Sequence, residues 1–204
     1  MLLTKILAPF AEDIEMPTKG RSSGFSLLEL MIVVTLAALI TAIGVPSFQS
    51  TVANQRRTAA VNELALAFNL ARSEAIKRVR YVSICKSNDG ATCGNPTVEW
   101  EDGWIIFANA DNASPGTVDP GDEIIRVHPA LNDTLTLRRT GVVDGFVSFR
   151  PSGTLGTAAV NHTGTLTLCD HRGAVAARGM ILRPSGQWIV SDDVGHDGAV
   201  LGCP

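Results

Sequence analysis

The sequence predicts an α+β protein in which one long N-terminal helix packs on one or more antiparallel β-sheets. Two observations support this fold class. Residues 25–45 form an unbroken apolar run that leads directly into an amphipathic helical pattern. After Arg80 the chain changes to short β-rich segments separated by Gly, Pro, Asn and Asp. Antiparallel strands beside a single long helix define the α+β class.

The apolar run is long enough to cross a membrane. It extends from Phe25 to Val45, which is 21 residues, and a helix rising about 1.5 Å per residue needs about 20 residues to span a bilayer core. Glu29 is the one charged residue in the run. A carboxylate left in lipid costs roughly 2–3 kcal/mol, so we interpret Glu29 as a functional residue. A secretory signal peptide fits less well because its apolar core is usually about 7–15 residues long. A plain membrane anchor is the other alternative.

The helical pattern continues past the apolar run. Gly44 and Pro46 lie near its end, and we expect the helix to bend there because proline removes a backbone hydrogen bond. Beyond Pro46, apolar residues recur mostly every three or four positions: Phe48, Val52, Ala60, Val61, Leu64, Phe68, Ala71, Ala75 and Val79. We therefore predict one helix from about Phe25 to about Arg80, whose second half packs its apolar stripe on a sheet.

Eight strands are predicted after the helix. They are Tyr81–Cys85, Trp104–Ala108, Glu123–His128, Thr134–Arg138, Phe146–Arg150, Gly164–Cys169, Gly179–Arg183 and Gln187–Ser191. The polar segment Asn109–Asp122 is predicted to be a surface loop. Arg-Pro-Ser-Gly occurs twice, within Phe149–Gly153 and Leu182–Gly186, and each copy is expected to end a strand and reverse the chain.

Cysteine usage indicates two disulfides. The chain has four cysteines, Cys85, Cys93, Cys169 and Cys203, and a domain beyond a membrane helix faces an oxidising compartment. Three pairings are possible. We favour Cys85–Cys93, which closes a short loop around a turn signal, and Cys169–Cys203, which holds the C-terminal end in place. Zinc is the alternative, but the sequence has no C-x-x-C and its histidines are scattered.

No cofactor or enzymatic activity is expected. The loop residues Asp111, Asp119, Asp122 and Glu123 could supply oxygens to calcium, but their spacing does not match an EF-hand, and a solvated loop is favoured. No nucleophile elbow, catalytic triad order or phosphate-binding loop is present. The formal net charge of −3 gives no overall basic field for nucleic acid.

The N-terminal residues carry a family resemblance. Lys19 and Arg21 precede Gly24, which is followed by Phe25-Ser26-Leu27-Leu28-Glu29 and the apolar helix. This pattern resembles the signature of type IV pilins and pseudopilins. The resemblance implies that prepilin peptidase cleaves after Gly24 and that Phe25 becomes the methylated N-terminus. It also implies that Glu29 pairs with the N-terminal amine of an adjacent subunit. The basic leader would stay cytoplasmic.

A second resemblance narrows the family. Motifs of the GspH/FimT branch of minor pilins and pseudopilins resemble four segments of this chain. These segments are residues 101–107 and 121–126, with the polar loop between them, and Phe149–Gly153 and Thr165–Cys169. DNA-binding members of that branch carry G-R-x-R in a C-terminal strand. This chain has Gly186-Gln187-Trp188-Ile189 there, so nucleic acid is not expected as a partner.

Together these resemblances imply a non-enzymatic, low-copy minor pilin that takes part in assembly or initiation of a type IV pilus, near its tip. A GspH-like pseudopilin of a type II secretion system is the alternative, as is a DNA-binding minor pilin for natural transformation. The implied partners are other minor and major pilins, prepilin peptidase and, before assembly, the bacterial inner membrane. The globular domain would face the periplasm, and the assembled subunit would reach the pilus at the cell surface.

The chain is accordingly expected to have four parts. Residues 1–24 form the leader, 25–46 the transmembrane and filament-core helix, 47–80 the amphipathic helix, and 81–204 the β-rich globular domain. A start at Met16 would give a short, purely basic leader. We therefore expect residues 1–15 to be untranslated or dispensable.

Overall fold

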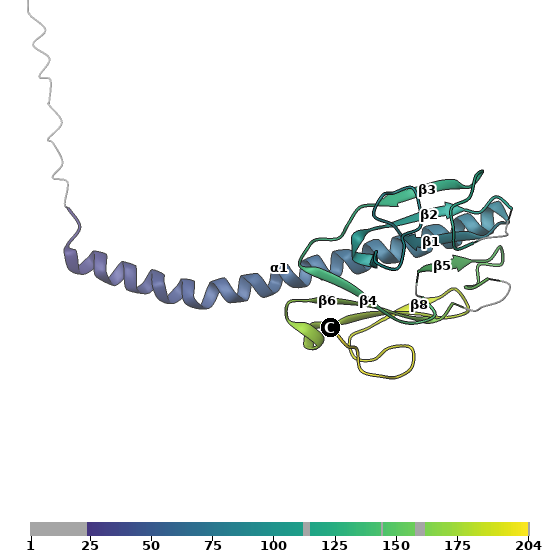
Figure 1. Cartoon of the computed structure of the whole chain (residues 1–204). Helices are drawn as coiled ribbons and strands as arrows, with labels where there is room; N and C mark the ends of the chain where they lie inside the picture. Colours follow the sequence, from purple (N-terminus) through teal and green to yellow (C-terminus); the bar gives the residue numbers. More distant parts are fainter. Residues whose placement is uncertain (1–23, 112–114, 144, 158–161, 204) are drawn as a thin grey trace, which may run out of the picture. The chain divides into compact units, whose positions relative to one another are not determined.

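The computed structural model describes residues 24–111, 115–143, 145–157 and 162–203 (Figure 1). The chain divides into an N-terminal unit, Met1–Pro46, and a globular unit, Ser47–Pro204. The predicted leader up to residue 23, including Met16, lies outside the described residues.

Helix α1 extends from Leu27 to Arg78 and confirms the prediction of one long helix. The helix continues through Pro46, so the bend expected there remains a prediction. It contains a segment long and apolar enough, by length and composition, to cross a membrane. Residues 24–46, the described part of the N-terminal unit, are all exposed.

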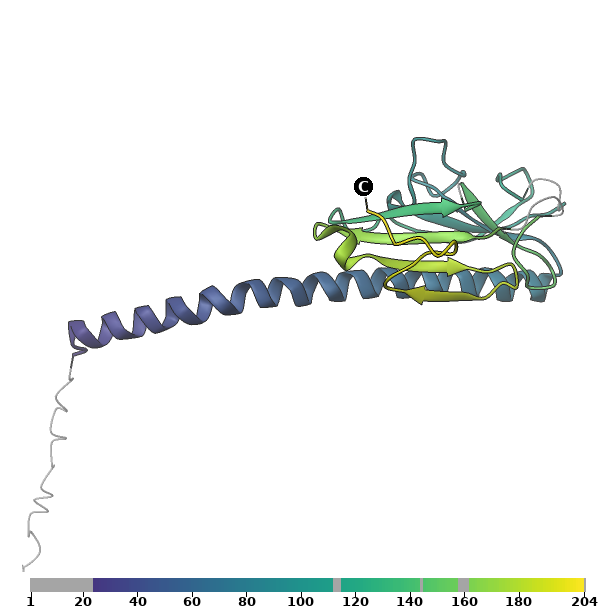
Figure 2. The same ribbon diagram turned by 90° about the horizontal axis from the view of Figure 1, so that it is seen from below.

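The strands of the globular unit form two four-stranded antiparallel sheets (Figures 1 and 2). The first sheet has the order β3-β2-β1-β5 and is built from β1 (Val82–Lys86), β2 (Trp104–Ala108), β3 (Glu123–His128) and β5 (Phe146–Phe149). The second has the order β4-β6-β7-β8 and is built from β4 (Leu135–Gly141), β6 (Gly164–Asp170), β7 (Arg178–Leu182) and β8 (Trp188–Ser191). Short 3₁₀ turns, η1 (Trp100–Asp102) and η2 (Gly173–Ala176), lie in the connections.

All eight predicted strands are present. The bounds of β2 and β3 are those predicted, and the other ends differ by at most three residues. The largest difference is in β4, which extends to Gly141 because Thr140 and Gly141 continue to pair with Thr165 and Gly164 of β6.

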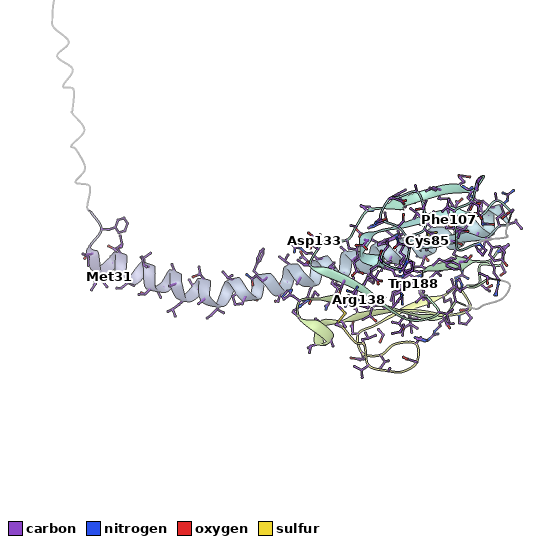
Figure 3. The ribbon with its side chains drawn as sticks, viewed as in Figure 1. Met31, Cys85, Phe107, Asp133, Arg138 and Trp188 are labelled. Carbon is purple, nitrogen blue, oxygen red and sulfur yellow. A yellow bond between two sulfur atoms is a disulfide. The ribbon has the colours of Figure 1, made fainter. Side chains whose placement is uncertain are left out.

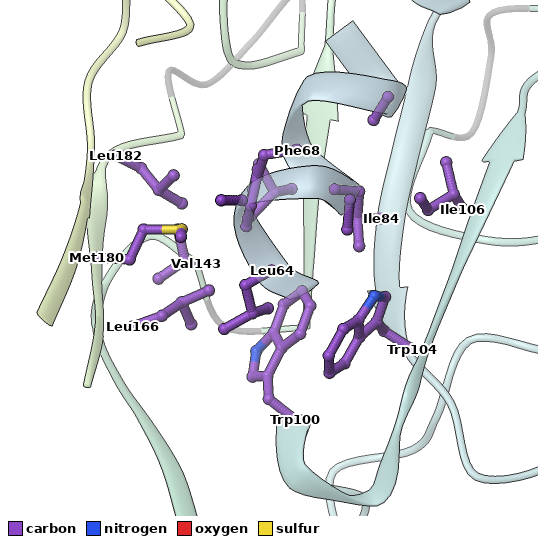
Figure 4. Packing of buried hydrophobic residues seen from close by; sticks show 14 of the residues in the cluster. Leu64, Phe68, Ile84, Trp100, Trp104, Ile106, Val143, Leu166, Met180 and Leu182 are labelled. Atoms are coloured by element: carbon purple, nitrogen blue, oxygen red, sulfur yellow. The ribbon is translucent and has the colours of Figure 1, made fainter. Parts of the chain in front are cut away.

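The helix packs against both sheets in one core. Figure 4 shows Leu64 and Phe68 of α1 between side chains of the two sheets, with Ile84 and Trp104 on one side and Met180 on the other. Phe68 meets Phe149 edge-on, with ring centroids 6.2 Å apart. The buried helix face is rich in alanine, which lets the helix lie close to the sheets; its members are Ala60, Val61, Leu64, Ala65, Ala67, Phe68, Ala71 and Ala75.

The predicted apolar stripe was wrong at both ends. Phe48 is 69% exposed and Val79 is 70% exposed, so neither belongs to the core. The sheets cover the helix only from Ala60 onward. Val79 follows the last helical residue and has a φ of 54°, which ends the helix and turns the side chain to solvent.

The repeated Arg-Pro-Ser-Gly segments both form the predicted turns. The Gly153 amide donates to the Arg150 carbonyl at 2.8 Å, and the Gly186 amide donates to the Arg183 carbonyl at 2.9 Å. The second copy joins the antiparallel pair β7 and β8. The turns also lie against each other, because the Leu155 amide donates to the Pro184 carbonyl at 2.9 Å. A Cβ at Gly186 would lie 2.0 Å from the Gly153 carbonyl oxygen, so this contact has no room for a side chain.

Candidate functional site

The predicted processing junction lies at the start of the described residues. Gly24 and Phe25 precede α1, and Phe25 is 81% exposed. Glu29 lies in the first turn of the helix. A carboxylate is favoured there by the partial positive charge of a helix N-terminus.

Glu29 differs from the threonines of the same segment in its hydrogen bonding. The Thr35 hydroxyl donates to the carbonyl of Ile32 at 2.8 Å, and the Thr41 hydroxyl donates to that of Ala37 at 2.9 Å. Those hydroxyls are therefore satisfied within the helix, as an apolar environment requires. Within residues 24–46, all of which the structure describes, the Glu29 carboxylate has no hydrogen-bond or ion-pair partner. In apolar surroundings an unpaired carboxylate is costly, so the pairing of Glu29 with another subunit stays a prediction.

Both disulfides join the cysteines that the sequence favours. Cys85 is linked to Cys93 with a Cα–Cα distance of 5.5 Å, and Cys169 is linked to Cys203 at 5.9 Å. Cys85 lies in β1 and packs with Phe107 in a small cluster outside the main core (Figure 3). Cys169 lies in β6 and packs with Ala177 and Leu201. The second bridge thus fastens the C-terminal segment to the second sheet.

Carboxylates of the acidic loop form hydrogen bonds and an ion pair within the chain. The Asp122 carboxylate accepts the amides of Ala110 at 2.8 Å and Asp119 at 3.0 Å. Glu123 forms an ion pair with Arg78 of α1 at 2.5 Å, and the hydrogen bond from Arg78 lowers the pKa of the Glu123 carboxyl. Within the described residues, no three His, Cys, Asp or Glu side chains are placed together to hold a metal ion. The structure therefore does not bring the four candidate calcium ligands together.

Most arginines of the β-rich domain are occupied by intramolecular contacts. Arg138 pairs with Glu101, Arg172 with Asp170, and Arg178 with Asp192 at 2.8 Å. Arg150 donates to the Leu155 carbonyl at 3.3 Å. Figure 3 shows Arg138 among the side chains of the globular unit. At the places of the two G-R-x-R arginines, Gln187 directly precedes β8 and Ile189 lies within it; β8 is an edge strand of the second sheet.

Cys169 and Asp170, which directly precede His171, are both engaged in contacts within the chain. Cys169 is in a disulfide. Asp170 accepts from the Arg172 guanidinium at 3.0 Å, and this hydrogen bond lowers the pKa of the carboxyl. Neither residue is free to act as a nucleophile or a base.

The sequence analysis missed a groove on the globular unit. It has a volume of about 320 Å³ and lies between the beginning of the unit's helical segment and the ends of β4 and β6. Its walls are Phe48, Gln49, Val52, Ala53, Arg56, Thr134, Leu135, Asp170 and His171. The exposed side chain of Phe48 lines this groove.

The fold and the N-terminal segment define a class of protein: a structural subunit with a long apolar N-terminal helix and a disulfide-bonded β-rich unit. A family model described as "Type II transport protein GspH" matches residues 60–186. A second, described as "Prokaryotic N-terminal methylation motif", matches residues 19–45. The chain belongs to the GspH family of pilin-like proteins, which are structural and not enzymatic.

Solved structures include similar proteins. Two crystal structures of the type IV minor pilin FimU of Pseudomonas aeruginosa PAO1 each share 22% identity with this chain, with a TM-score of 0.49. Each alignment covers 66% of this chain and, respectively, 91% and 87% of the FimU chains. No curated protein matches the chain.

Proposed function

We propose that this chain is a low-copy minor pilin of a type IV pilus, which takes part in assembly or initiation near the pilus tip. The observation that carries the proposal is the unpartnered Glu29 carboxylate in the apolar helix of a chain that bears the methylation motif. The motif implies processing by prepilin peptidase, and membership of the family implies other pilins as partners.

The proposed sequence of events uses each part of the chain. The leader, residues 1–24, is removed after Gly24, and Phe25 is methylated at its amine. Residues 25–46 hold the subunit in the inner membrane and then enter the filament core, while residues 47–80 support the β-rich domain, residues 81–204, outside it. Glu29 pairs there with the N-terminal amine of an adjacent subunit. Opposite charges in apolar surroundings offset each other's loss of hydration.

Gly44 and Pro46 would make the helix easier to bend as the subunit moves from the membrane into the filament. Proline leaves the carbonyl four residues earlier without its helical hydrogen bond, and glycine lowers the cost of distortion. We propose that the helix bends or locally unwinds there as the subunit leaves the membrane.

A second candidate function is a GspH-like pseudopilin of a type II secretion system. The description of the matching family model favours it. Deleting the gene separates the two functions. A pilus subunit predicts loss of surface pili with normal protein secretion, and a pseudopilin predicts the reverse. A DNA-binding role has less support, because Arg138, Arg172 and Arg178 are held in ion pairs.

The decisive experiment is Glu29→Leu. Removing a lone carboxylate from a passive anchor should help membrane insertion, whereas removing it from an assembling pilin should break a charge pair. We expect normal membrane levels and normal cleavage after Gly24, but loss of the protein from sheared filaments. Mass spectrometry of the N-terminus and immunoblots of both fractions measure these outcomes.

Thr35→Leu is the matched control for this experiment. It also replaces a polar side chain of the same segment, but the Thr35 hydroxyl bonds only to its own helix. We expect it to enter filaments normally. Equal incorporation of Glu29→Leu and wild-type protein would show that the charge pair is not used by this subunit.

A further inference from the structure

Each of the two sheets ends in two edge strands, and three of these four edges are protected. On β5, the Ser148 amide donates to the His162 ring at 3.0 Å, so the chain after the strand covers its outer side. On β4, the Leu137 amide donates to the Glu101 carboxylate at 3.2 Å. Strand β3 carries charged residues such as Arg126, and its pairing with β2 is irregular. Charges, bulges and covering segments keep an edge from pairing with another chain.

Strand β8 has none of these protections. It consists of Trp188, Ile189, Val190 and Ser191, so it has no charged residue and no proline, and its pairing with β7 is regular. Ile189 is 39% exposed and Val190 is 41% exposed. Within the part of the chain that the structure describes, β7 is the one strand that pairs with it. An uncharged and exposed edge of this kind is a template for an added strand.

The register of β8 shows which main-chain groups face the open edge. The Arg183 amide donates to the Gln187 carbonyl at 2.9 Å, and the pairing with β7 is regular from there to the end of the strand. Hydrogen-bonded and non-bonded positions alternate in an antiparallel ladder. Ile189 therefore bonds to β7, and Trp188 and Val190 direct their amides and carbonyls to the open edge. Among the described residues, none of these four groups has a hydrogen-bond partner.

A free charge lies near each end of β8. Arg183 precedes the strand at the turn from β7, and Asp193 follows it. Both residues are exposed, and neither side chain has a hydrogen-bond or ion-pair partner within the described ranges, whereas the neighbouring Asp192 pairs with Arg178. An antiparallel partner strand would begin beside Asp193 and end beside Arg183. The complementary strand is therefore apolar, with a basic residue before it and an acidic residue after it.

We propose that the open edge of β8 binds an extended apolar segment of a neighbouring pilin subunit as an added antiparallel strand. Trp188 and Val190 supply the main-chain hydrogen bonds, and Ile189 contacts the side chains of the segment. Arg183 and Asp193 set its direction through their opposite charges. The inference rests on the proposed function, which supplies other pilins as partners, and adds the mode of contact. A low-copy subunit meets other pilins more often than a second copy of itself, so a different pilin is expected.

The test uses the full-length protein in cells that assemble filaments. The photo-cross-linker benzoylphenylalanine replaces Gln187, an exposed residue directly before β8. Arg126, an exposed residue on the protected edge strand β3, is the control position. We expect position 187 to cross-link to a pilin peptide in which an apolar run lies between a basic and an acidic residue. Any adduct at position 126 should not respond to changes in β8.

Val190→Pro is the decisive variant. It removes an amide that faces the open edge, so the hydrogen bonds between β7 and β8 remain. We expect the cross-link yield at position 187 to fall about tenfold, because the added strand loses a hydrogen bond and meets the proline ring. Val190→Ala also shortens the side chain but keeps the amide, and it should retain most of the yield. Reversal of both end charges, Arg183→Glu with Asp193→Arg, should lower the yield several-fold.

Three results would overturn the inference. They are no adduct at position 187 in a protein that enters filaments, an adduct whose yield responds equally to Val190→Pro and Val190→Ala, and an adduct with a second copy of this chain alone. In each case the proposed function would stand. Absence of the wild-type protein from sheared pili would instead overturn the proposed function. Tryptophan fluorescence and intact disulfides establish that each variant is folded, and if Val190→Pro is not, the charge reversal decides.

Discussion

His162 is a buried histidine whose neutral form the structure requires. Its Nδ1 atom accepts the Ser148 amide at 3.0 Å, and its ring meets Phe146 edge-on. A protonated ring could not accept that amide. Burial, and then the charge of Arg150, lowers the pKa of His162 below its ordinary value of 6.5. The unfolded chain therefore binds this proton at a higher pH than the folded protein does.

This difference predicts how stability changes with pH. The contribution of His162 is fully present above pH 6.5 and is lost as the pH falls from there through the lower pKa of the folded state. We expect urea unfolding midpoints to fall between pH 7.5 and pH 5, and His162→Gln to show a smaller fall. Tryptophan fluorescence reports on the globular unit, because all three tryptophans lie in it. Equal pH dependence in both proteins would contradict the assignment.

The disulfide between Cys85 and Cys93 could be predicted from the sequence because the two cysteines flank a turn. Glu29 stands out because one charge interrupts an apolar run, and its role stays a prediction. The groove could not be found in this way, because its walls come from segments far apart in the sequence, such as Arg56, Leu135 and Asp170.

The end of helix α1 contains a strained residue. Val79 has a φ of 54°, a conformation that β-branched residues rarely adopt. The Arg80 amide donates to the Ala75 carbonyl at 3.3 Å, which is the hydrogen bond of a Schellman helix end, where glycine is the usual residue. The Val79 side chain is 70% exposed, so it contributes little packing in return.

Val79→Gly is therefore expected to stabilise the globular unit. The left-handed conformation costs a residue with a Cβ about 1–2 kcal/mol, and the greater flexibility of glycine when unfolded offsets part of the gain. We expect a net increase of roughly 0.5–1 kcal/mol in the free energy of unfolding. Val79→Ala, which keeps the Cβ, should gain less than half as much. A lower unfolding midpoint for Val79→Gly would show that the valine is not strained.

Strand positions were readable from the sequence, and their assembly was not. Turn residues and β-rich runs are local signals, so β2 and β3 were predicted to the residue. The separation into two sheets depends on pairs far apart in the chain. Strand β1 pairs with β5, with Val82 opposite Phe149, and nothing near Val82 indicates that partner. For the same reason the sequence wrongly placed Phe48 in the buried stripe. Its spacing continues the helical pattern, but the sheets do not extend to this part of the helix.

For the whole molecule, the two disulfides should differ in their contribution to stability. They close segments with sequence separations of 8 and 34 residues. In the chain-entropy model the shorter contributes about 2.5 kcal/mol and the longer about 4 kcal/mol. The longer bridge also packs with Leu201 and with Ala177, which directly precedes β7.

We therefore expect the double variant Cys169→Ser/Cys203→Ser to lose more stability than Cys85→Ser/Cys93→Ser. Urea unfolding of each full-length variant, followed by tryptophan fluorescence, measures the difference. Peptide mapping without reduction checks that the remaining bridge is intact in each variant. A greater loss for the Cys85–Cys93 pair would mean that native packing, and not loop closure, decides their relative contributions.

The contact between the two Arg-Pro-Ser-Gly turns links residues that are 33 positions apart. The Gly186 backbone approaches the Gly153 carbonyl so closely that a Cβ would lie 2.0 Å from it, and Arg72 donates to the Gly186 carbonyl at 3.1 Å. A side chain gained at position 186 would be tolerated only if the first turn shifted as well. Substitutions in the two turns should therefore be coupled, so that a side chain at position 186 is accepted only together with a change in the first turn.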